Sequence, residues 1–212
     1  GWMLKSLNFN FFVIEKELSL RSIAVRDGLQ SYESVEELLR FVDKESLDIV
    51  FLAVKPQQMS KTIKVFSRID FSNTLFNSIA AGLSFHWFQA TLKKDIKIVR
   101  AMPNLPASVG FGLTGYCQTC NVNEIETQNT QELLSAFGKA VYLGSEALID
   151  VVTAISGSGP AYVFYFVEAL SGIGVNQGLS RNDAKTLALE TIIGSARLLE
   201  MSNIDPKILK EN

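Results

Sequence analysis

The 212-residue chain has few of the side chains from which most catalytic centres are built. It contains one histidine, His86, in the segment LSFHWF, where we expect a helix residue beside Trp87 and Phe88 rather than a catalytic base. Its two cysteines, Cys117 and Cys120, have the C-x-x-C spacing of a zinc or redox pair. Zinc would need two more ligands, and the histidine lies far away in sequence. We therefore predict two reduced thiols and no bound metal.

The sequence also lacks an excess of either charge and any long apolar run. Lys+Arg number 20 and Asp+Glu 22, so the net charge of -2 would not attract nucleic acid or an anionic membrane. No stretch approaches the roughly 20 apolar residues of a membrane span, and the start shows no signal-peptide pattern. We predict a cytoplasmic protein with neither nucleic-acid nor membrane partners, and the 47% hydrophobic content suffices for a core.

Apolar runs rich in β-formers alternate with amphipathic segments over the first two thirds of the chain. The predicted strands are 9–17, 47–56, 75–82, 96–103, 110–117 and 140–144. The predicted helices are 34–42, 57–69, 84–92 and 124–138. This alternation predicts an α/β fold with a mostly parallel sheet that helices cover on both faces.

Ligands of such sheets bind beyond the carboxyl ends of the strands. The segments AVKP (53–56) and IAAG (79–82) follow two predicted strands, so a ligand is expected beside them. The alternative is that their small residues and proline merely end the strands.

After Gly144 the strand pattern stops, and the segment SGSGP leads into a helix that is apolar on almost every side. Pro160 suits the first helical turn, and Gly172 and Gly174 are expected to mark the end of this helix. Two further helices are predicted, from Ser180 and from residue 205.

We therefore predict an α/β domain over 1–144 and a helical domain over 145–212. A helix that is apolar all round needs neighbours on every side, and two other helices cannot supply them. The pattern favours a homodimer whose helices pack against their symmetry mates.

The segment before this helix is expected to be a loop of small residues. Such a loop exposes backbone N–H groups at a helix N-terminus, where negative charge is favoured. A small carboxylate, a cofactor phosphate or another backbone could lie there, and the alternative is close helix packing at the dimer centre. The residues concerned are Ser156, Gly157, Ser158 and Gly159.

Several longer segments occur in an order and spacing that resemble one enzyme family. They are LAVKPQQM, SIAAGL, IVRAMPNLPASVGFGLTG, DVVTAISGSGPAYVFYFVEAL, GLSRNDAKTLALETIIGSA and PKILKEN, and together they resemble pyrroline-5-carboxylate reductase. The resemblance implies a Rossmann-like domain that binds NADPH or NADH, followed by a helical domain that forms a dimer or a higher homo-oligomer. It also implies reduction of 1-pyrroline-5-carboxylate to L-proline. Alternatives are another Rossmann dehydrogenase with a helical dimer domain, or a catalytically dead dimeric scaffold.

The resemblance also implies roles for individual residues. Glu146 matches a family position near the substrate. The positions that match the family's cofactor contacts are Ala53, Val54, Lys55, Pro56, Ala80, Ala81 and Asn212. No catalytic residue is assigned, because the cofactor carries the hard chemistry and hydride adds readily to a protonated imine.

Glu15 ends the segment FFVIE of the first predicted strand. An acidic side chain there would accept a hydrogen bond from the ribose 2′-OH of NAD and repel the 2′-phosphate of NADP, which favours NADH. The alternative is a solvated charge beside Lys16.

The sequence departs from the family pattern at both ends. The family begins with a strand and a glycine-rich loop, whereas this chain opens with GWMLKSLNF, which resembles the last turns of the helix after that loop. The family also continues past LKEN into a substrate loop and a final helix. We therefore expect a truncated form with an unpaired slot in its sheet, poor cofactor binding and slow or absent turnover.

Overall fold

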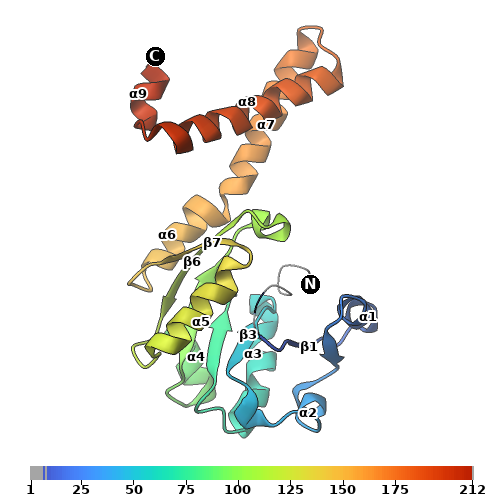
Figure 1. Cartoon of the computed structure of the whole chain (residues 1–212), viewed down its shortest axis with the longest axis vertical. Helices are drawn as coiled ribbons and strands as arrows, with labels where there is room; N and C mark the ends of the chain where they lie inside the picture. Colours follow the sequence, from blue (N-terminus) through green and yellow to red (C-terminus); the bar gives the residue numbers. More distant parts are fainter. Residues whose placement is uncertain (1–6, 8, 212) are drawn as a thin grey trace. The chain divides into compact units, whose positions relative to one another are not determined.

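The computed structural model describes residue 7 and residues 9–211, and the chain divides into two compact units, 1–157 and 158–212 (Figure 1). The division falls after the predicted boundary at residue 144, because α6 (Leu148–Val152) contacts strands of the sheet and belongs with them. The boundary drawn from the sequence pattern stays a prediction.

Five strands form the main sheet of the first unit, in the order β3-β4-β5-β6-β7. Every neighbouring pair is parallel except β5 with β6, so the prediction of a mostly parallel sheet is confirmed. The strands are β3 (Ile49–Leu52), β4 (Leu75–Ser78), β5 (Ile98–Met102), β6 (Gly112–Gln118) and β7 (Gly138–Tyr142).

A second sheet contains β1 (Phe12–Ile14) and β2 (Gln30–Tyr32), which pair in parallel. Among the described residues no strand pairs with both sheets. Strand β2 was not predicted, because its three residues, Gln-Ser-Tyr, form no apolar run.

Helices cover both faces of the main sheet because its strands alternate their side chains. On β4, Phe76 packs with Met59 and Phe88 on one face, whereas Leu75 packs with Leu134 on the other. The helices of this unit are α1 (Leu18–Arg26), α2 (Val35–Leu38), α3 (Pro56–Ile63), α4 (Phe85–Leu92), α5 (Glu124–Ser135) and α6 (Leu148–Val152). Helix α1 was not predicted; it buries none of its residues, so its sequence carries no clear apolar stripe.

The second unit contains α7 (Gly159–Asn176), α8 (Arg181–Ser202) and α9 (Pro206–Glu211). The expected end of α7 at Gly172 and Gly174 is wrong, because the helix continues through both. A Cβ on Gly174 would lie 3.0 Å from the Cβ of Ala184, so this glycine permits the close approach of α7 and α8. The chain turns two residues after α7, at Gly178, whose φ of +101° suits glycine.

Helix α7 has no buried residue within the described chain, although it is strongly apolar. Tyr162 and Tyr165 are 62% and 73% exposed. Phe164 and Phe166, on the same helix, are also more than half exposed. Exposed apolar surface of this kind marks an interaction site. Among the described residues no helix has the length and apolar character needed to cross a bilayer.

We predict that Gly138→Ala strongly destabilises the first unit. Gly138 pairs with Gly112 across β6 and β7, its φ is +137°, and a Cβ would overlap the Gly112 carbonyl oxygen. The free energy of unfolding in urea should fall by about 3 kcal/mol, the upper range for overpacking. Gly144→Ala is the matched control: its φ is +63° with no atom within 4 Å, so strain alone should cost about 1–2 kcal/mol. Equal losses in the two variants would contradict this account of the β6–β7 contact.

Candidate functional site

The carboxyl ends of β3 and β4 lie side by side, since these strands are adjacent and parallel. Residues 53–55 follow β3 and lead into α3, in whose first turn Pro56 lies. Residues 79–82 follow β4 at the same edge. The structure therefore brings together the two segments that the sequence predicted as a ligand site, which we call the edge segments (53–56 and 79–82).

The edge segments offer small, open side chains to a ligand. Ala53, Lys55 and Ala81 are exposed, whereas Ala80 is 7% exposed and belongs to the core beneath. A Cβ on Gly82 would meet no atom within 4 Å. A flat ligand could thus approach the backbone closely, as a dinucleotide does beyond a parallel sheet.

The carboxyl end of β1 carries an acid and a cation. Glu15 is half-buried, and its Oε1 accepts a hydrogen bond from the Glu17 backbone N–H at 3.0 Å. From α1, Arg21 Nη1 donates to the carbonyl oxygens of Glu15 and Lys16 at 2.9 and 3.0 Å. The sequence interpretation missed Arg21 because it did not predict α1.

A partly buried ion pair joins β5 to the chain before α6, beside the start of α4. Arg100 on β5 is 6% exposed, and its Nη1 donates to Glu146 Oε1 at 2.6 Å. The same oxygen accepts from the Phe85 backbone N–H, in the first turn of α4, at 2.7 Å. Glu146 thereby connects β5, the helix that follows the second edge segment, and the chain just before α6.

Sequence reasoning singled out Glu146 but missed Arg100. The signal was present, because a lone arginine in the apolar strand IVRAM needs a buried partner. The acidic partner lies 46 residues away in the chain, which no local pattern reveals.

The buried Cys117 thiol lies near this ion pair. Burial raises the pKa of Cys117 to about 11, although the Arg100 charge opposes this rise. The thiol is therefore protonated at neutral pH, and the thiolate is the reactive form. Cys117 and the exposed Cys120 are both free, and residues 7 and 9–211 contain no cluster of three or more His, Cys, Asp or Glu side chains suited to a metal.

The predicted small-residue loop is wrong as a description of the backbone, because the segment is helical. Helix α6 continues into a π-helical turn (Thr153–Gly157), and α7 begins at Gly159 with Pro160 in its first turn. Small residues allow this change of helix type without side-chain crowding, and π-turns are frequent at functional sites. Ser158 lies at the N-cap position of α7 but makes no side-chain cap hydrogen bond.

Ser156 is the buried polar residue of the π-helical turn, at 9% exposure. Its Oγ accepts a hydrogen bond from Asn104 Nδ2 at 3.1 Å. A Cβ on Gly157 would come no nearer than 3.7 Å to the Met102 sulfur, an ordinary contact. Asn212, which the resemblance assigned to the cofactor, lies outside the described residues.

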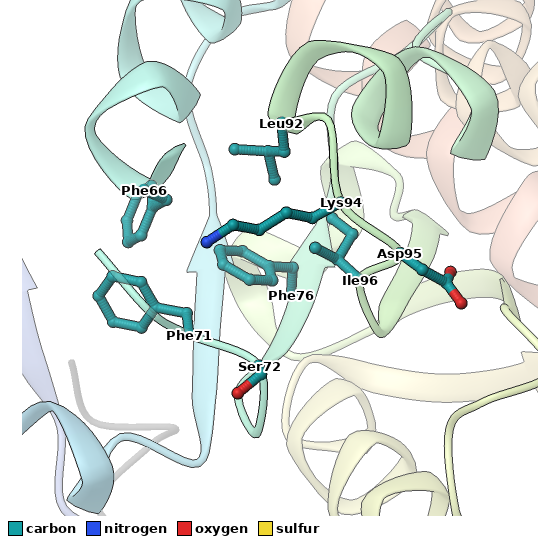
Figure 2. A pocket seen from close by; sticks show the side chains of 8 residues that line it. All are labelled: Phe66, Phe71, Ser72, Phe76, Leu92, Lys94, Asp95 and Ile96. Carbon is teal, nitrogen blue, oxygen red and sulfur yellow. The ribbon is translucent and has the colours of Figure 1, made fainter. Parts of the chain in front are cut away.

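A cavity of about 270 Å³ lies elsewhere on the first unit (Figure 2). Its walls belong to the amino ends of β4 and β5 and to the segments that enter them, with Lys94 extending across it. The edge segments lie at the carboxyl ends of the same sheet, so this cavity is separate from them. Its apolar lining consists of Phe66, Phe71, Phe76, Leu92 and Ile96.

Comparison with known proteins gives consistent matches. Residues 146–212 match the family model described as pyrroline-5-carboxylate reductase dimerisation. The chain is 36% identical to pyrroline-5-carboxylate reductase from Aquifex aeolicus over 200 residues. This alignment covers 94% of this chain and 72% of that protein. It is 39% identical over 163 residues to the enzyme of the same name from Pseudomonas aeruginosa, covering 77% of this chain and 60% of that protein.

A solved structure agrees with these matches. The crystal structure of Plasmodium falciparum pyrroline carboxylate reductase with NADP bound is similar with a TM-score of 0.81 at 31% identity. The similarity covers 99% of this chain and 77% of that chain. The alignments to the Aquifex and Pseudomonas proteins span 72% and 60% of their lengths, respectively.

We predict that Glu146→Leu destabilises the first unit by about 3 kcal/mol, because it leaves the Arg100 charge buried without a partner. It also removes the acceptor of the Phe85 N–H. The matched control is Glu146→Gln, whose amide oxygen can still accept both hydrogen bonds, and we expect it to lose about 1 kcal/mol. Urea unfolding measures both, and equal losses would contradict the assigned role of Glu146 as the hydrogen-bond acceptor of Arg100 and Phe85.

Proposed function

The chain belongs to the pyrroline-5-carboxylate reductase family, and from this we propose that it takes part in the NAD(P)H-dependent reduction of 1-pyrroline-5-carboxylate to L-proline. The observation that carries the proposal is the 36% identity to the Aquifex enzyme over 94% of the chain. The placement of the edge segments at one end of a parallel sheet supports it. Proline biosynthesis in the cytoplasm is part of the same proposal.

The edge segments would hold the cofactor. Ala53 and Ala81 are small and exposed, and α3 begins beside them, so a dinucleotide could lie flat against the backbone. When bound, the reduced nicotinamide supplies the hydride. Val54, Lys55 and Pro56 would line the same face, and Ala80 would support it from the core.

The choice between NADPH and NADH depends on opposing groups at the end of β1. Glu15 favours the free ribose 2′-OH of NADH, whereas an arginine such as Arg21 can accommodate the 2′-phosphate of NADPH. Arg21 already binds the carbonyl oxygens of Glu15 and Lys16, which fixes its guanidinium at this end of the strand. The NADP in the Plasmodium structure makes NADPH the first cofactor to test.

The substrate is a five-membered ring that contains a C=N bond and bears a carboxylate. Its reduction needs a protonated imine, a correctly placed ring and compensation of the carboxylate charge. In our proposal Ser156 and Gly157 lie near this carboxylate, and the backbone N–H groups of Ser158 and Gly159, at the start of α7, favour an anion.

Glu146 would lie near the substrate with one oxygen still available. Its Oε1 binds Arg100 and Phe85, while its Oε2 makes no hydrogen bond within the described part of the chain. The Glu146 side chain is 30% exposed, so a ligand could reach it. A carboxylate oxygen beside the ring would favour the protonated imine, because opposite charges attract.

We further propose that α7 forms the centre of a homodimer. The match of residues 146–212 to the dimerisation model supports self-association. Within the second unit α8 buries Ala184 and Ala188, whereas the aromatic residues of α7 stay exposed. A second copy of α7 has the apolar surface to cover them, and isologous contacts are the commonest solution.

The central prediction is enzymatic. The 212 residues should be tested with NADPH and NADH in the presence of 1-pyrroline-5-carboxylate, alongside a chimera that adds the Aquifex residues outside the aligned region. We expect the chimera to oxidise one cofactor molecule for each L-proline formed. A chimera that binds NADPH but forms no L-proline would point to a dimeric scaffold. Turnover of a different substrate alone would point to another dehydrogenase.

A matched pair of variants controls for cofactor placement in this assay. Ala81→Trp should weaken NADPH binding at least about tenfold, since the indole would fill the exposed edge. Ala90→Trp adds the same group at an exposed position of α4 and should leave NADPH binding unchanged. Fluorescence titration of NADPH measures both, and equal effects would remove the edge segments from the cofactor site.

The dimer proposal predicts an effect of Gly159→Leu. A Cβ at Gly159 meets no atom of its own chain within 4 Å, so the monomer can accommodate the side chain. If a partner backbone comes close there, the dimer dissociation constant in sedimentation equilibrium should rise at least about tenfold. A dimer of unchanged affinity would contradict the placement of this residue, and a monomeric wild-type protein at micromolar concentration would contradict the dimer itself.

A further inference from the structure

The cavity at the amino ends of β4 and β5 has no part in the proposed function, and we call it the amino-end cavity (Figure 2). Its volume is about 270 Å³, whereas protein interiors contain few voids larger than a water molecule. Side chains that line a void lose dispersion contacts, which an occupant of matching chemistry would restore. The lining therefore indicates which molecule the cavity would take.

Three phenylalanine rings form the apolar wall of the amino-end cavity. Phe66 lies in the short helix η3 (Lys64–Arg68), Phe71 follows it, and Phe76 lies on β4. The ring of Phe66 meets the rings of Phe71 and Phe76 edge-on, with centroids 5.1 and 5.4 Å apart. Aromatic rings prefer edge-to-face and offset neighbours, so a further ring could extend this cluster into the cavity.

A single cation extends across the cavity beside these rings. Helix α4 ends at Leu92, and Lys93, with a φ of +55°, turns the chain so that Lys94 follows it. Figure 2 shows the Lys94 side chain crossing the cavity with its amino group toward the rings. Within the described part of the chain, Lys94 Nζ donates one hydrogen bond, to the Ile69 carbonyl oxygen at 3.4 Å. An ammonium group has three donors, so Lys94 has donors left for a ligand.

The two carboxylates near Lys94 have other hydrogen-bond partners. Asp95 points away from the cavity in Figure 2, and its Oδ1 accepts from Gln89 Nε2 at 3.1 Å. Asp70 Oδ1 accepts from the Ser72 backbone N–H at 3.1 Å. The hydrogen bonds from Ser72 are the main reason that the pKa of Asp70 is lowered, and the Lys94 charge contributes less. Neither carboxylate makes an ion pair with Lys94 among the described residues.

We propose that the amino-end cavity binds a small organic acid with one apolar ring. Its ring lies against the three phenylalanines, and its carboxylate accepts from Lys94 Nζ. An apolar cavity of about 150 Å³ is enough to bind benzene, so 270 Å³ accommodates a ring that bears a carboxylate. Water is a poorer occupant, because a buried water needs about three polar partners and the phenylalanines offer none.

This inference goes beyond the proposed function and does not rest on it. The cavity lies at the opposite end of the strands from the edge segments, and all of its lining residues belong to the first unit. Its test therefore needs neither the nicotinamide cofactor nor turnover.

The experiment is a titration of the 212-residue protein with sodium benzoate, followed by the methyl NMR signals of Leu92 and Ile96, which line the cavity. We expect saturable shifts of both signals, with a dissociation constant in the millimolar range because the ligand has few atoms. Benzamide has the same ring without the charge and should bind at least about fivefold more weakly, since charge-assisted hydrogen bonds are the stronger ones.

A matched pair of variants isolates the contribution of Lys94. Lys94→Met keeps an apolar stem and removes the charge, and should weaken benzoate binding at least about fivefold while benzamide binding changes less than about twofold. Lys93→Met removes the same charge from an exposed neighbour that is not part of the cavity lining, and should leave benzoate binding unchanged. Both positions are exposed, so the urea midpoints of both variants should stay close to that of the wild type.

Each other outcome overturns the inference. Methyl signals of Leu92 and Ile96 that do not saturate with benzoate would remove the ligand from the cavity. Equal affinities for benzoate and benzamide, or equal losses for both ligands in Lys94→Met, would contradict the assignment of an acid. A loss of benzoate binding in Lys93→Met as large as in Lys94→Met would reduce the effect to general surface charge. None of these results bears on the reduction of 1-pyrroline-5-carboxylate, so the two proposals fail separately.

Discussion

The parallel pairing of β3, β4 and β5 is the constraint on which the rest of the first unit depends. Parallel strands need a crossover between them, so these three strands leave the sheet at the same edge and the helices between them return along its faces. This arrangement gathers the edge segments and the start of α4 at one end. The same arrangement separates the edge segments from the cavity in Figure 2, which lies at the amino ends of β4 and β5.

The charged and polar side chains around this edge hold backbone segments in place, and in our proposal none of them reacts with the substrate. The charge of Arg100 is compensated by Glu146, whose carboxylate also receives the first N–H of α4. Asn104 binds the turn that precedes α7 from the end of β5. An imine reductase can work with such groups, because the cofactor brings the hydride and the protein supplies position and charge. This explains why a chain with a single exposed histidine fits the proposed activity.

Much of this arrangement could be predicted from the sequence, because long apolar runs and small-residue segments have local signals. The five strands of the main sheet, and the place of the edge segments at one edge of it, follow from them. Helix α1 and strand β2 were missed because they bury little and carry no periodic pattern. The π-helical turn and the packing role of Gly174 were missed because glycine and serine alone do not distinguish a loop from close contact. Arg100, Asn104 and their partners meet only through the fold, across 46 and 52 residues.

The central claim is that the edge of the parallel sheet holds a nicotinamide cofactor beside a turn that holds the substrate carboxylate. A crystal structure of the protein with NADPH and L-proline tests it most directly. We predict the dinucleotide against Ala53 and Ala81, and the carboxylate of L-proline beside the π-helical turn. A cofactor bound at the amino ends of β4 and β5, or L-proline bound away from the π-helical turn, would contradict the account.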